Sequence, residues 1–320
     1  MFANPILARC DDRAVAPKFH PTSGSVENWF SDEILRRHQL FGLTFDFFAN
    51  WSLSPPAITP VIWIKKVLSS NHDYAHVIAN LDFIMISELG ESYLDLIRLF
   101  GSNHNLTIQF ILFKDNLDWS LDSSELLIIQ LNNRKLSDTI FKVEKVVIVD
   151  LKTQIRQYSG MPINIGKKGL TFGTSNLECY LSCTNCIYPG DVDLILLNSK
   201  KQPIAIVEFK KHTLSSSITE QKLGNYYPKP DARKYNRLSI LKDYLSGKYP
   251  KIPMLNLYYP TPQNFNEGRL ELLKGETGKL TTQVGSNFLL PKQNSAQDYD
   301  KVINKILKAI SYHQSITNRL

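Results

Sequence analysis

Apolar and polar residues recur with strand and helix periods along most of this chain, most clearly in its second half. Two apolar runs separated by a polar turn, residues 191–197 and 204–210, predict a β-hairpin. A helix is predicted over 231–246, where apolar residues recur at helical spacing between a proline and a glycine. Residues 254–259 predict a further strand, and residues 299–312 predict a closing amphipathic helix.

The first half of the chain predicts a less regular structure. The first 60 residues are rich in aromatics and prolines and predict an irregular lead-in with a short helix near 29–41. A helix is predicted over 91–100. Strands are predicted over the apolar runs 81–86, 106–113, 125–130, 146–149 and 176–182. The order of elements predicts an N-terminal α/β region over residues 1–150 and a second α/β domain over residues 151–320, with no internal repeat.

The composition is that of a folded globular protein. With 320 residues, 43% of them hydrophobic and 21% charged, the chain can bury one large core or two modest ones. No run approaches the roughly 18 apolar residues that cross a bilayer, and the first 25 residues lack an export signal. We therefore expect no membrane association and a cytoplasmic location.

The net charge of +7 is concentrated in one stretch of the chain. Residues 200–251 hold twelve Lys or Arg and four acids, a local net charge of +8, so the rest of the chain is close to neutral. A basic stretch of this kind predicts an anionic partner such as a nucleic acid.

Charged residues interrupt the two apolar strands of the predicted hairpin. Asp191 and Asp193 begin the first strand, and Glu208 and Lys210 lie two apart on the second, so the members of each pair share a face. Unpaired charge is costly to bury, so these side chains are expected to converge on a common partner.

The chemistry that suits two neighbouring carboxylates and a lysine is phosphodiester hydrolysis. The carboxylates repel each other unless a hard cation lies between them, which favours Mg²⁺, or Mn²⁺ in its place. Such an ion activates water and stabilises charge on a phosphate, and the ammonium group assists beside it.

The pattern Asp193-x14-Glu208-x-Lys210 resembles the PD-(D/E)XK nuclease superfamily over about 80 residues, roughly 175–260. The resemblance implies an α/β fold with a restriction-endonuclease-like mixed sheet flanked by helices. The N-terminal α/β region is an addition to that fold, and the expected role of this region is recognition or regulation. It further implies a nuclease of the restriction or repair type that hydrolyses double-stranded DNA. A homodimer is compatible with the resemblance.

The resemblance also assigns roles to residues. It makes Asp193 and Glu208 metal ligands, adds the carbonyl of Phe209, and puts Lys210 near the attacking water. Gly190-Asp191 and Val192-Asp193 are both candidates for the Pro-Asp position of the family, so Asp191 is a further possible ligand. An upstream acid is expected at Glu178, and phosphate contacts are expected from Lys211, Arg233, Lys234 and Arg237.

Two other hypotheses belong to different functional classes. A non-catalytic nucleic-acid-binding protein with a nuclease-like fold would carry the same basic stretch. Cys179-x3-Cys183-x2-Cys186 has the spacing of a radical-SAM iron-sulfur motif, and its thiolates could also bind zinc. The plainest interpretation is that these cysteines are small hydrophobic residues of the core. The chain holds four cysteines and no export signal, which does not predict a disulfide framework.

Overall fold

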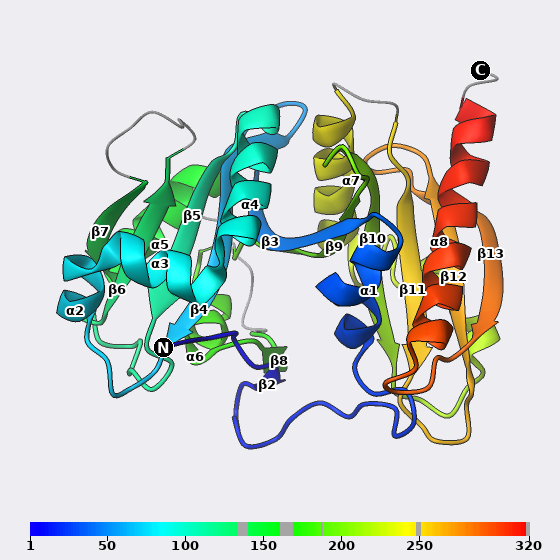
Figure 1. The fold of residues 1–320 in the computed structure, drawn as a ribbon, viewed down its shortest axis with the longest axis horizontal. Coiled ribbons are helices and arrows are strands. Elements are labelled where there is room, and N and C mark those ends of the chain that lie inside the picture. Colours follow the sequence, from blue (N-terminus) through cyan, green and yellow to red (C-terminus); the bar gives the residue numbers. More distant parts are fainter. Residues whose placement is uncertain (133–139, 161–168, 187, 248–250, 318–320) are drawn as a thin grey trace. The chain divides into compact units, whose positions relative to one another are not determined.

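The structure is a computed structural model that describes residues 1–132, 140–160, 169–186, 188–247 and 251–317. Among these residues, none of the helices is long and apolar enough to cross a membrane. The fold is mixed α/β, with mixed sheets flanked by helices (Figure 1).

The chain divides into two compact units. Unit 1 comprises residues 1–17 and 45–191, and unit 2 comprises residues 18–44 and 192–320. The boundary expected near residue 150 thus differs from the observed division, which falls after residue 191 and assigns part of the N-terminal segment to unit 2.

Unit 1 is built on the sheet order β3-β4-β5-β6-β7, in which only the β4–β5 pair is parallel among the described pairs. Its strands are β1 (Phe2–Ala3), β2 (Ala8–Arg9), β3 (Phe41–Asn50), β4 (Ala57–Leu68), β5 (Thr107–Phe113), β6 (Glu125–Leu131), β7 (Phe141–Val147) and β8 (Phe172–Gly173). Its helices are α2 (Tyr74–Ala79), α3 (Leu81–Leu89), α4 (Glu91–His104), α5 (Ile148–Ser159) and α6 (Asn176–Ser182). The short β1 pairs with β4, and β2 pairs with β8.

The two faces of the unit 1 sheet are covered by different helices. On one face, Phe45 contacts Phe100 of α4, and the helix approaches the sheet so closely at Gly101 that an added Cβ would lie 2.7 Å from Ile108. On the other face, α5 and α6 pack against a core that includes Phe48 and Trp63. The sheet is therefore buried on both sides, which accounts for its nearly continuous apolar strands.

Unit 2 has the sheet order β9-β10-β11-β12-β13, with β10 and β11 parallel and the other described pairs antiparallel. Its strands are β9 (Gly190–Leu197), β10 (Pro203–His212), β11 (Met254–Pro260), β12 (Glu267–Lys274) and β13 (Thr281–Leu289). Its helices are η1 (Val26–Phe30), α1 (Asp32–Arg37), η2 (Ile218–Glu220), η3 (Leu223–Asn225), α7 (Ala232–Ser246) and α8 (Ala296–Thr317).

Helices also cover both faces of the unit 2 sheet. On one face η1, α1 and α8 pack on Leu194, Val207 and Leu255, with Trp29 fully buried in this layer (Figure 1). The opposite face carries the alternate residues of the same strands and meets α7. Strand alternation thus separates an apolar layer from a face that carries charged residues.

The sequence predicted the elements of unit 2 better than those of unit 1. The predicted hairpin, the helix ending at Gly247, the strand after it and the final helix are all present. The predictions of an irregular lead-in and of strands over 81–86 and 176–182 were wrong: β3 and β4 occupy the first region, and α3 and α6 occupy the other two. The strands β12 and β13 were not predicted.

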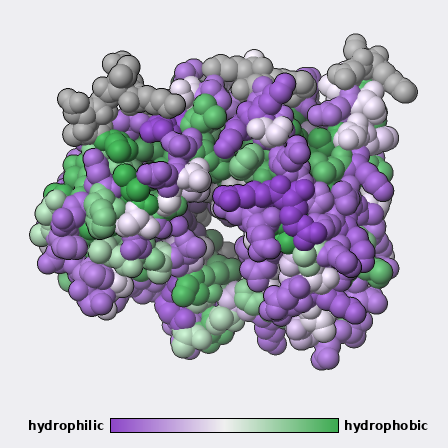
Figure 2. Space-filling view, in the orientation of Figure 1, coloured by the Kyte–Doolittle hydropathy of each residue, from purple (hydrophilic) through white to green (hydrophobic). Residues whose placement is uncertain are grey.

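The apolar run 81–86 shows why one strand prediction failed. In α3, Ile84 and Met85 are buried, whereas Phe83 is 76% exposed, so apolar residues surround the helix instead of following one stripe. A short run of this kind gives no period from which helix and strand can be distinguished. Figure 2 shows such apolar side chains lying among polar ones on the surface of unit 1.

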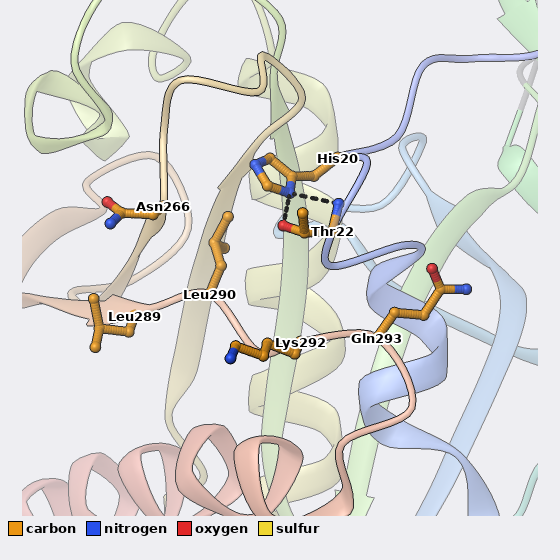
Figure 3. Close-up of a pocket in the computed structure, with 7 residues that line it drawn as sticks. All are labelled: His20, Thr22, Asn266, Leu289, Leu290, Lys292 and Gln293. Atoms are coloured by element: carbon orange, nitrogen blue, oxygen red, sulfur yellow. Dashed lines mark hydrogen bonds between the residues drawn. The ribbon is translucent and has the colours of Figure 1, made fainter.

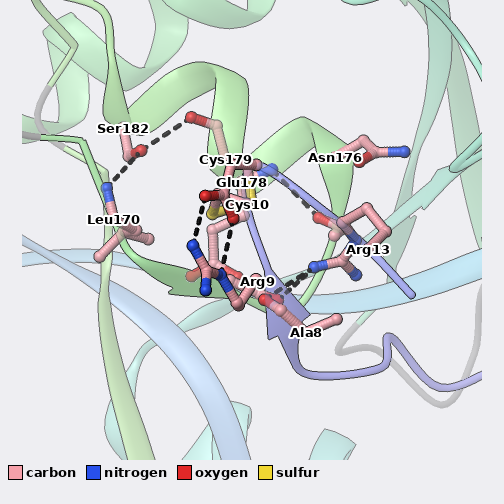
Figure 4. Close-up of a disulfide and its surroundings, with 12 residues drawn as sticks. Ala8, Arg9, Cys10, Arg13, Leu170, Asn176, Glu178, Cys179 and Ser182 are labelled. Carbon is pink, nitrogen blue, oxygen red and sulfur yellow. Dashed lines mark hydrogen bonds and ion pairs between the residues drawn. A yellow bond between two sulfur atoms is a disulfide. The ribbon is translucent and has the colours of Figure 1, made fainter. Parts of the chain in front are cut away.

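Unit 1 contains a disulfide that the sequence analysis did not predict. Cys10, next to β2, is bonded to Cys179 of α6, 169 residues further along the chain (Figure 4). Arg13 reinforces the same junction, since its guanidinium donates to the carbonyl oxygen of Gly173 at 2.6 Å. The bond ties the N-terminal segment to the end of the unit.

Because the disulfide closes a long loop, it is expected to stabilise unit 1 chiefly by restricting the unfolded chain. Cys10→Ser should lower the free energy of unfolding by roughly 2–4 kcal/mol. Chemical denaturation with and without a reductant measures this: the parent protein should lose stability on reduction, and Cys10→Ser should not respond. Cys183→Ser, which removes an exposed free thiol, is the matched control. Equal unfolding midpoints for the parent and Cys10→Ser would contradict the expectation.

Candidate functional site

Two carboxylates from adjacent strands of unit 2 converge on one ammonium group. Val207 of β10 pairs with Leu194 of β9, which puts Glu208 opposite Asp193 on the face that meets α7. The Nζ atom of Lys234, on α7, lies 2.7 Å from Oε1 of Glu208 and 3.9 Å from Oδ1 of Asp193. The hairpin and the helix together therefore gather two acids around one point.

Lys210 lies beside these acids in a fixed position. Its ammonium is 3.2 Å from Oε1 of Glu208 and 2.8 Å from Oδ2 of Asp231, just before α7. The rings of Tyr226 and Tyr235 lie 5.0 and 5.1 Å from the same Nζ atom, a cation–π arrangement. Burial would lower the pKa of Lys210, but the neighbouring carboxylates outweigh it and raise that pKa, so the lysine stays charged.

The two acids differ in how they are held. The backbone N–H of Phe209 donates a hydrogen bond to Oδ2 of Asp193 at 2.7 Å, which fixes the direction of that carboxylate. The Glu208 side chain is only 2% exposed, and no donor among the described residues makes a hydrogen bond to its Oε2 atom. A buried carboxylate oxygen without a hydrogen bond is costly, and its position suits a cation.

A second buried acid supports the site from the neighbouring strands. Oε2 of Glu271, on β12, accepts hydrogen bonds from the hydroxyl of Tyr258 at 2.7 Å and from the backbone of Leu223 at 2.8 Å. The hydroxyl of Tyr258 also accepts from the side-chain amide of Asn256 at 2.9 Å. The Tyr226 ring stacks against Tyr258, so Glu271 fixes both the strand and the loop that flank Lys210.

The donor set suits a hard divalent cation. Asp193, Glu208 and Asp231 contribute three carboxylates against the ammonium groups of Lys210 and Lys234, which leaves one net negative charge. Mg²⁺ is commonly bound through one or two carboxylates, with water and substrate phosphate completing its six positions. Within the described ranges no group of three His, Cys, Asp or Glu side chains is arranged to hold a metal, so the protein would supply only part of the coordination sphere.

Two acids proposed from the sequence belong to unit 1 and have partners there. Glu178 begins α6, where its carboxylate accepts from the backbone of Thr174 at 2.6 Å and lies 3.8 Å from Nζ of Lys65. Burial raises the pKa of Asp46 to about 7, and the exposed Asp191 adds to this rise through its negative charge. Neither is part of the site built by β9, β10 and α7.

The basic residues proposed to contact DNA are on different faces of unit 2. Lys234 lies in the site, and Arg233 beside it on α7 is exposed. Arg237 follows one turn later and is half-buried. Lys211 projects from the other face of β10, where its ammonium lies 4.3 Å from the centre of the Phe19 ring, so it is not at the site.

The cysteine motif does not form a three-thiolate group in this structure. Cys179 is consumed by the disulfide with Cys10, Cys183 is exposed, and Cys186 is buried in the core of unit 1. The structure therefore offers no support for an iron-sulfur or zinc site at these residues.

A separate pocket in unit 2 lacks the chemistry of the site. Its volume is about 530 Å³, and it is lined by His20, Thr22, Asn266, Leu289, Leu290, Lys292 and Gln293 (Figure 3). Both ring nitrogens of His20 are engaged, one with the carbonyl of Phe265 at 2.8 Å and the other with Thr22. No carboxylate lines this pocket, so it does not resemble a hydrolytic centre.

Three residues of the site were not singled out from the sequence: Asp231, Tyr258 and Glu271. Asp231 could have been found from the sequence, because an acidic residue is common at the position just before the first residue of a helix. Glu271 was missed because its strand, β12, was not predicted.

No family model, curated protein or solved structure matches this chain. The function of this chain is therefore inferred from the geometry of the site.

Lys234 occupies the space between the two acids, so its removal should change how strongly the site responds to a cation. In EDTA, Lys234→Met is expected to lower the free energy of unfolding by roughly 1–3 kcal/mol, because two partly buried carboxylates lose a counter-charge. Added Mg²⁺ should then raise the melting temperature more in Lys234→Met than in the parent protein. Thermal unfolding in EDTA and in millimolar Mg²⁺ measures both effects.

The exposed neighbour on the same helix provides the control. Arg233→Met removes a positive charge from α7 without touching either acid, so its response to Mg²⁺ should equal that of the parent. An equal response of all three proteins would mean that the cation does not bind between Asp193 and Glu208.

Proposed function

We propose that this protein is a metal-dependent nuclease of the PD-(D/E)XK type that hydrolyses phosphodiester bonds in double-stranded DNA, with Mg²⁺ or Mn²⁺ as cofactor. One observation carries the proposal: Asp193 and Glu208, on paired strands, both lie against a single ammonium group, with Lys210 next to them. Carboxylates gathered in this way, with one net negative charge over their counter-ions, suit a divalent cation and a phosphate substrate.

The residues of the site have separable roles in this reaction. When bound, the metal ion would lower the pKa of water and stabilise charge on the phosphate. Asp193 and Glu208 would hold it, and the hydrogen bond from the Phe209 backbone orients Asp193. Lys210, fixed by Asp231, would orient the attacking water or stabilise the negative charge that develops on the phosphate oxygens.

The charge of the same region supports a nucleic-acid substrate. Residues 200–251 carry a net charge of +8, and they include β10, the loop through η2 and η3, and α7. Exposed Arg233 and half-buried Arg237, one turn apart on α7, are suited to contact phosphates of the DNA backbone. Such contacts position the duplex without selecting a sequence.

A non-catalytic nucleic-acid-binding protein is the second candidate. The observation in its favour is that Lys234 lies 2.7 Å from Glu208, where it offsets the carboxylate without a metal. This candidate predicts salt-sensitive DNA binding with no cleavage under any metal condition. The same assay therefore decides between the two.

Loss of either catalytic side chain should abolish cleavage while leaving the fold intact. Glu208→Gln removes a proposed metal ligand, and Lys210→Met removes the ammonium while keeping much of the side-chain volume. Each is expected to reduce the rate of DNA cleavage in Mg²⁺ by at least about 10²- to 10³-fold. Plasmid and linear DNA incubated with purified protein in Mg²⁺ or in EDTA give the measurement.

Lys211→Met is the matched control, because Lys211 is the adjacent residue on β10 but projects from the other face. Its cleavage rate should stay within a few-fold of the parent. Metal-dependent cleavage that persists in Lys210→Met and in Glu208→Gln at the parental rate would show that the site is misassigned.

A further inference from the structure

The two units share one topology, although the sequence shows no internal repeat. In unit 1 the pair β3–β4 is antiparallel, β4–β5 is parallel, and β5–β6–β7 are antiparallel. In unit 2 the pairs β9–β10, β10–β11 and β11–β12–β13 follow the same order and directions. Each unit thus consists of a hairpin, a helical crossover to a parallel strand, two antiparallel strands and a final helix.

The helices also cover corresponding faces of the two sheets. In unit 1 the crossover helix α4 covers one face and the final helix α5 covers the other. In unit 2 the crossover helix α7 and the final helix α8 divide the faces in the same way. Crossovers between parallel strands are right-handed almost without exception, so the face under α4 corresponds to the face under α7.

Strand register identifies the positions in unit 2 that make the site. Glu208 lies opposite Asp193 on one side, and it pairs with Asn256 of β11 on the other. Lys210 follows two residues later on the same face and pairs with Tyr258. All of these side chains are on the sheet face that meets α7.

The corresponding positions of unit 1 are apolar. On the face under α4, Phe47 pairs with Ile62, and Ile62 pairs with Ile108. Two residues further along β4, Ile64 pairs with Phe110. These side chains are all buried, so the described positions that correspond to Asp193 and Glu208 are filled by hydrophobic core and hold no carboxylate.

The buried ion-pair cluster of unit 1 is on the opposite face of its sheet. Asp46 pairs with Trp63, whose side chain packs in the core beneath α5 and α6. Nζ of Lys65 lies 2.9 Å from Asp46 and 3.1 Å from the hydroxyl of Tyr188, and Glu178 is also adjacent. This ion-pair cluster therefore does not correspond to the arrangement of Asp193, Glu208 and Lys210.

From these observations we infer that unit 1 is a non-catalytic copy of the fold of unit 2, and that one chain cleaves one strand of a DNA duplex per encounter, leaving a nick. The inference rests on the proposed nuclease function and specifies its product. Hydrolysis of both strands in one encounter would require a second catalytic centre, and the position where the fold would put one holds Phe47 and Ile62.

The product distribution from supercoiled plasmid tests the inference. With limiting protein and Mg²⁺, nicked circles should account for most of the early product, and linear DNA should appear only later, from independent second events. Linear DNA formed directly from supercoiled plasmid at every protein concentration would require two coordinated centres and would overturn the inference. Absence of metal-dependent cleavage under all conditions would instead contradict the proposed function.

Metal binding tests the location of the centre without using activity. Titration with Mn²⁺, followed by electron paramagnetic resonance, should show binding by the parent protein that is lost in Glu208→Gln and unchanged in Asp46→Asn. Asp193→Asn and Glu178→Gln repeat the comparison with a second variant of each unit, in case a buried substitution impairs folding. Mn²⁺ binding or nicking that survives in folded Glu208→Gln and Asp193→Asn, but is lost in the unit 1 variants, would place a centre in unit 1.

Discussion

The burial of the Glu208 carboxylate is the constraint on which the site depends. Burying a carboxylate that is only 2% exposed is costly unless nearby positive charge offsets its lost hydration. Lys210 and Lys234 supply that charge from one strand and one helix, at 3.2 and 2.7 Å. The position of α7 against β10 is therefore coupled to the charge balance of the site.

The surrounding polar layer makes this arrangement rigid. Glu271 is fully buried, yet it accepts hydrogen bonds from the Tyr258 hydroxyl and from the backbone at Leu223. A buried acid satisfied by several donors costs less than an isolated one and fixes the groups that donate to it. Because Tyr226 stacks on Tyr258 and flanks Lys210, the order imposed by Glu271 extends to the proposed catalytic lysine.

How far the sequence predicts this molecule depends on how local the relevant signal is. The strands β9 and β10 were predictable, because charged residues at alternate positions within apolar runs mark one face of a strand. Helix α7 was predictable from Pro230 and Gly247 near its ends. The hairpin also predicted that the acids of the two strands would converge, whereas the register that puts Asp193 opposite Glu208 came from the structure. By contrast, the support from Glu271 depends on β12, which the sequence pattern did not reveal.

The errors in unit 1 have equally local causes. Residues 176–182 look apolar enough for a strand, but Ser175 caps a helix there, and its hydroxyl accepts from the backbone N–H of Glu178 at 3.1 Å. Ser-x-x-Glu before an apolar run is a known helix-start pattern, so this error was avoidable. The disulfide between Cys10 and Cys179 could not be predicted in this way, because its two cysteines are 169 residues apart and no local sequence pattern marks their pairing.

A sheet covered on both faces explains how one topology can occur with and without the proposed catalytic centre. Alternation assigns the odd and even residues of each strand to different layers, so the contents of one layer can change while the other keeps its packing. In unit 2 a hydrophobic core beneath α8 holds the sheet and helix together, which leaves the layer beneath α7 free to hold charges at a cost in stability. In unit 1 the paired positions beneath α4 that correspond to the site are apolar, and the buried ion pair of Asp46 and Lys65 is on the other side. The fold specifies where a centre can lie, and the residues of a single sheet face decide whether it exists.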